Sequence, residues 1–233
     1  MNCTRIEWAD YTWNPITGCL HGCPYCYAKK ITKRFPKNYP NGFNPTFYPE
    51  RLDEPLRVKK PSKIFTVSMG DMFGNWMKPQ WVRKIIKTIA DANWHQFQIL
   101  TKDPLSASQM LDFLDSSDGG LPHLDNLWIG TSIVDADAAH RITDLPFKKP
   151  RSGLRFVSFE PLLSSMPSDL DFSYNALDWV IIGAQTNPLK CPEDEWVQHI
   201  INCARDEDIP VFLKNSIQRY WPEHIQEFPE VPE

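Results

Sequence analysis

The sequence predicts an α/β fold, a closed or partly closed barrel of six or seven βα units. Two observations lead to this prediction. Short apolar runs typical of buried strands alternate with segments whose apolar residues have helical spacing, which indicates parallel βα units. The length of 233 residues suits six or seven such units, because the eightfold barrel typically takes about 250 residues. A doubly wound open sheet is the alternative.

The expected strands are short runs of β-branched, aromatic and other apolar residues. A first strand is expected within Tyr11–Gly18, directly before a group of cysteines. The later strands are separated by stretches long enough for a helix or a connecting loop. They are Lys63–Gly70, Phe97–Thr101, Asn126–Ile133, Leu154–Leu163, Asp178–Ala184 and Val211–Lys214.

Helices are expected between these strands. In Pro79–Asn93, the residues Val82, Ile85, Ile86 and Ile89 recur with helical spacing. A proline at the first helical position is favourable, which places the start of another helix at Pro104. The remaining helices are expected at residues 25–34, 104–114, 135–145 and 193–208.

In two segments the apolar residues show neither helical nor strand-like spacing. Residues 36–62 are rich in proline, asparagine and aromatic residues, and we expect a loop-rich insertion there. The stretch from Trp221 contains three prolines and is expected to pack on the surface as a tail. With no internal repeat, residues 1–233 are expected to form a single domain.

Bulk composition is that of an ordinary globular protein, with 42% hydrophobic and 23% charged residues. No apolar run approaches the roughly 18 residues that a membrane span needs. The N-terminus lacks the basic start and apolar stretch of a signal peptide, so a cytoplasmic protein without membrane contact is expected. In such a reducing compartment, clustered cysteines are more often metal ligands or catalytic groups than disulfide partners.

Charge is unevenly distributed along the chain. The net charge is −4, yet residues 29–63 carry ten Lys or Arg against three acids, a local charge of +7. The rest of the chain is therefore at −11. Such asymmetry indicates an anionic partner, and a solvated basic surface is the alternative.

Polar side chains recur where the expected strands end. Alternation of side chains places Thr66 with Ser68 on one face of their strand, and Gln98 with Lys102 on one face of theirs. We expect all the strand-end residues to share one face and one edge, the edge at which βα barrels form their active sites. They are Ser68, Lys102, Ser132, Glu160 and Lys214. The alternative is that these side chains only reach solvent.

Three cysteines, Cys19, Cys23 and Cys26, fall within eight residues where the first strand gives way to the first helix. Thiolates are good ligands for iron and zinc. A structural zinc site takes four ligands, and His21 in the same short loop is a doubtful fourth. Three thiolates around a 4Fe-4S cluster leave one iron open for a substrate or cofactor. The spacing therefore favours a redox enzyme.

The spacing C-x3-C-x2-C, with Tyr25 before the last cysteine, resembles the signature of the radical S-adenosylmethionine (SAM) superfamily. Several further segments resemble a phage-associated family of uncharacterised radical SAM-like proteins. They are Ile6–Trp8, Thr12–Cys19, Ser68–Phe73, Leu100–Lys102, Trp128–Ser132, Ser158–Leu163 and Asp178–Gly183. That family often has Gly-Gly-Glu after the last of these, where this chain has Gly183-Ala184-Gln185.

The resemblance implies a partial βα barrel of the radical SAM kind, with a 4Fe-4S cluster and SAM as cofactors. It implies cluster ligation by the three cysteines, reductive cleavage of SAM, and hydrogen-atom abstraction from a substrate. A one-electron donor such as flavodoxin or ferredoxin is then a partner. Met69, Gly70 and Asp71 lie where the superfamily binds the amino group of SAM.

The remaining expected roles concern the other end of SAM and the substrate. Ser132 and Glu160 are assigned to the ribose hydroxyls or carboxylate of SAM, and Lys102 to the carboxylate or an anionic substrate. Cofactor contacts are also expected from Tyr25, Ser68 and Gln185. Lys102, Glu160 and Lys214 are the candidate catalytic residues on the strand ends.

Cys191 is a further catalytic candidate. It follows the expected strand Asp178–Ala184, and a thiol there would donate a hydrogen atom to a product radical, by analogy with radical photoproduct lyases. An ordinary, partly buried thiol is the alternative. The substrate is expected to be a nucleic acid or nucleotide, because of the basic segment. The alternatives are a peptide or small metabolite, or a non-enzymatic iron–sulfur or zinc module.

Overall fold

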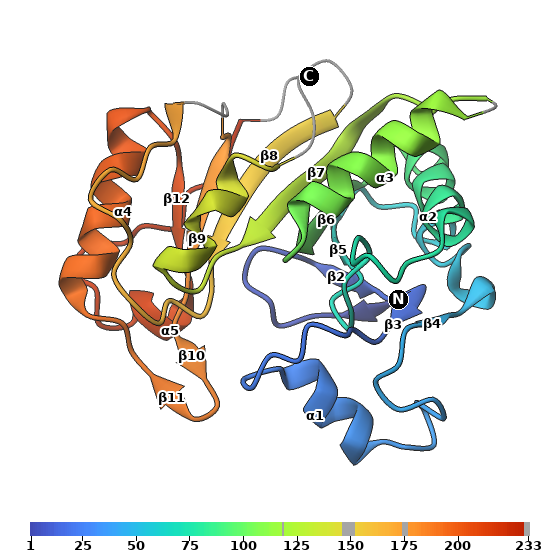
Figure 1. Ribbon diagram of the computed structural model, residues 1–233, viewed down its shortest axis with the longest axis horizontal. Coiled ribbons are helices and arrows are strands. Elements are labelled where there is room, and N and C mark those ends of the chain that lie inside the picture. The colour runs from blue at the N-terminus through green and yellow to red at the C-terminus, as the bar shows by residue number, and fades with distance from the viewer. Residues whose placement is uncertain (118, 146–151, 174–176, 231–233) are drawn as a thin grey trace. The chain divides into compact units, whose positions relative to one another are not determined.

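The computed structural model describes residues 1–117, 119–145, 152–173 and 177–230 (Figure 1). Over these residues the main sheet has eight strands in the order β1-β2-β5-β6-β7-β8-β9-β12, and the paired strands are mostly parallel. The α/β class is confirmed. The chain divides into two compact units. One comprises residues 1–129 with the described part of 146–153; the other comprises residues 130–145 with the described part of 154–233.

The first unit contains the N-terminal βα elements. Its strands are β1 (Asn2–Cys3), β2 (Tyr11–Trp13), β3 (Ile16–Thr17), β4 (Thr46–Phe47), β5 (Lys63–Thr66), β6 (Gln96–Thr101) and most of β7 (Leu124–Ser132). Its helices are α1 (Tyr27–Arg34), η1 (Pro49–Arg51), η2 (Pro55–Arg57), α2 (Pro79–Asp91) and α3 (Pro104–Ser116). The expected helices were therefore placed well, and the first expected strand is divided into β2 and β3.

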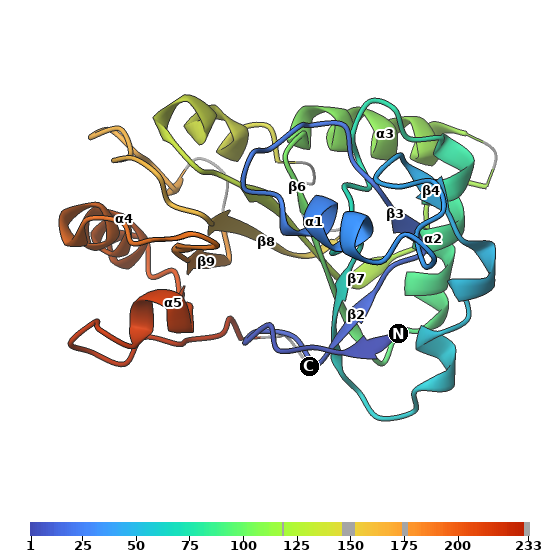
Figure 2. The ribbon, with the colours of Figure 1, turned by 90° about the horizontal axis from the view of Figure 1, so that it is seen from below.

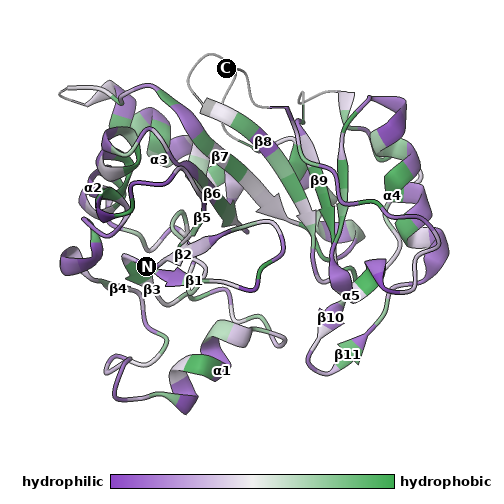
Figure 3. Cartoon of the chain, turned by 180° about the vertical axis from the view of Figure 1, so that it is seen from behind, coloured by the Kyte–Doolittle hydropathy of each residue, from purple (hydrophilic) through white to green (hydrophobic). Residues whose placement is uncertain are grey.

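The core of this unit follows from the apolar spacing noted above. Val82, Ile85, Ile86 and Ile89 of α2 are all buried, as their helical spacing predicts. Each such side chain contributes roughly 1.5–3 kcal/mol by leaving water. Hydrophobic residues concentrate on the strands, whereas α2 carries both hydrophobic and hydrophilic residues (Figure 3).

The loop-rich insertion is ordered by pairing with the start of the cysteine loop. Within residues 36–62, β4 pairs antiparallel with β3, and η1 and η2 follow. Two views show α1, β3 and β4 on the same side of the unit (Figures 1 and 2). The insertion is thus a neighbour of the three cysteines.

The predicted sharing of faces is wrong in the first unit. Parallel pairing places Phe65 opposite Gln98, and Thr66 opposite Ile99. Partners in register lie on the same face, so Thr66 and Gln98 lie on opposite faces of the sheet. The strand also ends at Thr66, because Val67 adopts a left-handed φ of +57° that breaks the alternation before Ser68.

The second unit contains the C-terminal elements. Its strands are the end of β7, most of β8 (Ser152–Phe159), β9 (Trp179–Ile182), β10 (Gln185–Thr186), β11 (Leu189–Lys190) and β12 (Val211–Leu213). Its helices are η3 (Ala136–Ile142), α4 (Asp194–Asp206) and α5 (Asn215–Gln218). The helix expected over 135–145 is a 3₁₀-helix, a difference that apolar spacing over so few residues does not resolve.

Trp179 is the centre of this unit's core. Its ring lies 5.7 Å from Phe156, 5.9 Å from Phe212 and 5.3 Å from Phe228. Its indole N–H donates to the carbonyl of Glu227 at 2.8 Å. Phe228 and Glu227 belong to the expected tail, which therefore packs on the core; its last three residues lie outside the described residues. No helix in the described parts of the chain is both long and apolar enough to cross a membrane.

Candidate metal centre

The three cysteines lie on one tight loop between β3 and α1. Gly18 and Gly22 turn the loop with φ of +93° and +72°. The backbone N–H of Cys26 donates to the carbonyl of Cys23 at 3.2 Å, and the Cys26 sulfur caps α1 by accepting from the N–H of Lys29 at 3.4 Å. All three thiols are free and half-buried.

Backbone contacts on two sides hold this loop in place. The N–H of Gly18 donates to Met69 at 2.9 Å, in a parallel bridge that also pairs Gly18 with Gly70. The N–H of Cys19 donates to Phe43 of the insertion at 3.2 Å. The cysteine loop is therefore fixed between the segment after β5 and the insertion.

Gly18→Ala is expected to destabilise the fold far more than Gly22→Ala. A Cβ at Gly18 would lie 2.3 Å from the backbone oxygen of Asn44, whereas a Cβ at Gly22 meets nothing within 4 Å. Both positions share the left-handed φ, which costs about 1–2 kcal/mol for alanine. The backbone clash adds roughly 1–3 kcal/mol at Gly18 alone. Denaturant unfolding measures the difference, and equal losses in the two variants would contradict the close approach.

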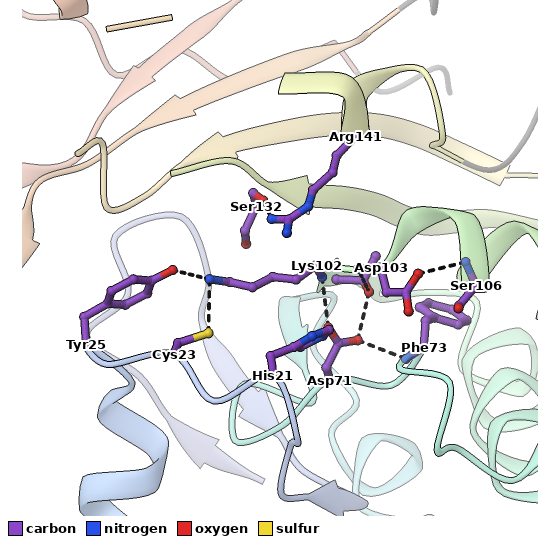
Figure 4. A network of polar contacts seen from close by, with 11 residues as sticks. His21, Cys23, Tyr25, Asp71, Phe73, Lys102, Asp103, Ser106, Ser132 and Arg141 are labelled. Atoms are coloured by element: carbon purple, nitrogen blue, oxygen red, sulfur yellow. Dashed lines mark hydrogen bonds and ion pairs between the residues drawn. The ribbon is translucent and has the colours of Figure 1, made fainter. Parts of the chain in front are cut away.

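A buried carboxylate, Asp71, joins this loop to the end of β6 (Figure 4). Its Oδ1 accepts from the N–H of Phe73 at 3.0 Å and the hydroxyl of Thr101 at 2.8 Å. Its Oδ2 accepts from Nε2 of His21 at 2.9 Å and the N–H of Lys102 at 2.9 Å. A carboxylate offers about four acceptor positions, so this one is fully used.

These bonds give Asp71 a structural role, and the expected contact of the Met69–Asp71 segment with the SAM amino group stays a prediction. Burial opposes its charge, but the hydrogen bonds from His21, Lys102 and Phe73 hold the pKa of Asp71 below its usual range. His21 also meets the edge of Trp76, with ring centroids 4.9 Å apart. His21 therefore links the cysteine loop to Asp71 and Trp76.

Lys102 reaches from the end of β6 to the cysteine loop. Its Nζ lies 3.4 Å from the sulfur of Cys23, contacts the hydroxyl of Tyr25, and lies 4.6 Å from the centre of the Tyr25 ring. Burial, partly offset by Lys102, raises the pKa of Tyr25, which stays a neutral phenol. The predicted residues Tyr25, Cys23 and Lys102 thus lie together (Figure 4).

The donor set of the loop suits a cluster. Burial raises the pKa of the Cys19 thiol to about 12, and metal binding at this sulfur would release its proton. In the described parts of the chain, no three or more His, Cys, Asp or Glu side chains gather around one point as ligands of a single ion. In a 4Fe-4S cluster the thiolates bind different irons and stand farther apart.

Ser68 and Met69 lie beside the cysteine loop, held by a residue that the sequence did not single out. The side chain of Asn14 hydrogen-bonds the Ser68 hydroxyl at 3.2–3.3 Å and accepts from the N–H of Met69 at 2.8 Å. The Ser68 carbonyl accepts from the hydroxyl of Tyr27. The position of Asn14 within the Thr12–Cys19 motif was the available signal.

In the second unit, two of the expected strand-end residues, Glu160 and Lys214, lie side by side. Their side chains form an ion pair of 2.5 Å, with exposed fractions of 25% and 15%. Gly183 lies between them, since a Cβ there would come 3.0 Å from both side chains. The register agrees, because Ser158, Ile181 and Phe212 are aligned on one face just before this trio. Gly183 was not predicted as a site residue.

The other predicted residues of this unit are more dispersed. The carbonyl of Ser132 accepts from the guanidinium of Arg141 at 2.8 Å. Gln185 belongs to the β10–β11 hairpin and donates to the carbonyl of Pro188 at 2.9 Å, which is a local structural contact. Cys191 is exposed directly after that hairpin.

Cys191 has a neighbour that sequence analysis missed. Its thiol lies near the hydroxyl of Tyr220, and burial together with this neighbour raises the pKa of Tyr220. Both side chains are partly open to solvent. No signal in the sequence connects two residues that are so far apart along the chain.

Comparison with known proteins shows a family and a fold. The model of the family described as "Protein of unknown function (DUF5131)" matches residues 3–227. Among curated proteins, none matches the sequence.

The fold is similar to solved structures of spore photoproduct lyase. One mutant aligns with a TM-score of 0.54 at 11% identity, covering 95% of this chain and 76% of that one. The enzyme complexed with dinucleoside spore photoproduct aligns with a TM-score of 0.51 at 11% identity, covering 88% and 63%. A mutant with the same dinucleoside aligns with a TM-score of 0.50 at 13% identity, covering 88% of this chain and 63% of that one. The chain thus spans 63% of the length of the lyase chain in these two structures, and the likeness bears out the predicted partial βα barrel.

Proposed function

Since the chain belongs to this family of unknown function, DUF5131, we propose its function from the site: it is a radical SAM enzyme. The observation that carries the proposal is the loop of Cys19, Cys23 and Cys26 after the first strands of a βα fold. Three thiols on a loop fixed by Gly18 and Asp71 supply a compact sulfur donor set. The spacing of the cysteines resembles the superfamily signature.

The three cysteines would hold a 4Fe-4S cluster with one iron open for SAM. When bound, the cluster and SAM would supply one-electron reductive cleavage of the sulfonium and, through it, hydrogen-atom abstraction from the substrate. The chain's own residues hold and orient the cofactors. Lys102 is proposed to attract the carboxylate of SAM, and Ser132 and Glu160 to bind its ribose.

We propose a nucleic acid or nucleotide as the substrate class. The local charge of +7 over residues 29–63 supports an anionic partner. Lys29, Lys30, Lys33 and Arg34 of α1 are all exposed, and the helix has no acidic residue. A structure with a similar fold contains a dinucleoside, which agrees with this class. A flavodoxin or ferredoxin is proposed as the electron donor.

The function is tested by SAM cleavage. Protein purified without oxygen, reconstituted with iron and sulfide and chemically reduced is expected to hold about four irons per chain. It should convert SAM to 5′-deoxyadenosine and methionine, both measured by chromatography. One zinc per chain and no cleavage with any strong reductant would overturn the proposal in favour of a structural metal module.

The substrate class has a separate test. Binding to single- or double-stranded DNA or RNA should weaken steeply as salt is raised, because each neutralised phosphate releases counterions. Absence of such binding, with SAM cleavage intact, would favour a peptide or a small metabolite.

A further inference from the structure

We propose that Lys102 tunes the reduction potential of the cluster by donating a charged hydrogen bond to the sulfur of Cys23. This inference rests on the proposed function, because it concerns the cluster that the three cysteines would hold. It assigns Lys102 a positioning and tuning role distinct from any contact with SAM.

The contact of Lys102 is with the sulfur of Cys23. The Nζ of Lys102 lies 3.4 Å from Sγ of Cys23, and the hydroxyl of Tyr25 interacts with both groups. Cys26 accepts a backbone N–H, from Lys29. Cys23 therefore differs from Cys26 in its surroundings.

A hydrogen bond of its backbone N–H helps to hold Lys102 in this position. Its N–H is bonded to the buried carboxylate of Asp71, which also binds Thr101 beside it. The same carboxylate binds His21 of the cysteine loop, so the start of the lysine and the loop share one anchor. The side chain is half-buried, which lessens solvent screening of its charge.

Charge and hydrogen bonding at the sulfurs set the potentials of iron–sulfur clusters. Reduction adds a negative charge, and a nearby ammonium stabilises the more negative state. Lys102 therefore makes reduction easier and raises the potential. Its neutral replacement is expected to lower the potential.

The test is a redox titration followed by electron paramagnetic resonance, performed without SAM so that a contact with SAM cannot contribute. Lys102→Met should titrate at a clearly lower potential than the wild type, and Lys102→Arg should stay close to it. The matched control is Lys29→Met, which removes one positive charge next to Cys26 from an exposed side chain without a contact to sulfur.

An unchanged potential in Lys102→Met, or a shift no larger than that of Lys29→Met, would overturn the inference. Should Lys102→Met fail to retain iron, Lys102→Gln keeps an N–H donor without charge and must shift in the same direction. Failure of the proposed function is distinct, because the wild type would then hold no 4Fe-4S cluster to titrate.

Discussion

A Cys23→Ala variant is expected to lose both the cluster and SAM cleavage, down to the background of the assay. The loss of one of three thiolates leaves two, too few for a cluster already short of the usual four cysteines. Cys23 is also the sulfur in contact with Lys102, so its removal leaves that ammonium without its sulfur acceptor. Iron content, the visible absorption of the cluster and 5′-deoxyadenosine production measure the effect.

The matched control for this change is Cys203→Ala. Cys203 lies on α4 in the second unit and contacts His199 at 3.8 Å, in no part of the proposed metal centre. It should retain iron and cleavage close to the wild type. SAM cleavage that survives in Cys23→Ala would contradict the assignment of the three ligands.

Asp71→Ala is expected to lower the free energy of unfolding by about 3–5 kcal/mol, as for removal of one partner from a buried charged network. The carboxylate is only 4% exposed and accepts four hydrogen bonds, so its loss leaves four donors without their acceptor. The cysteine loop should also become easier to cleave by proteases. Denaturant unfolding and limited proteolysis measure the two effects.

The control and the pH dependence sharpen this prediction. Asp91→Ala removes an exposed carboxylate paired with Lys87 on α2 and should cost at most about 0.5 kcal/mol.

The lowered pKa of Asp71 means that its ionisation stabilises the fold above the unfolded pKa of about 3.9, and that this contribution is lost as pH falls through the lower folded value. Below about pH 4 the wild type should therefore lose stability more steeply than Asp71→Ala. Parallel curves, or equal losses in the two variants, would contradict the role of Asp71.

The sequence predicts the βα elements because apolar spacing is local information. The buried positions Val82, Ile85 and Ile86 of α2 follow from their spacing alone. The face of Thr66 did not follow, because pairing between β5 and β6 fixes which residues are aligned, and no local pattern specifies that register. The left-handed φ of Val67 could not be predicted either, because residue propensities disfavour that conformation for a β-branched residue.

Some residues of the candidate site could likewise be predicted from local sequence, whereas others depend on packing. Cys19, Cys23 and Cys26 were found because they lie close together in sequence. The bond between His21 and Asp71 joins residues that are far apart in sequence, and burial of that carboxylate depends on packing. The role of Gly183 can be predicted only when its two neighbours in space are known, because its lack of a side chain makes room for the Glu160–Lys214 pair.

The bonds of Asp71 also set an order of events during protein synthesis. The cysteines leave the ribosome early, but the carboxylate that binds His21 is itself completed by Thr101 and Lys102. Until that later segment has emerged and formed β6, the nascent loop lacks its anchor. The anchored geometry of the loop is therefore complete only after nearly half the chain has been translated, and metal bound at the proposed centre before that point would meet a loop without its anchor.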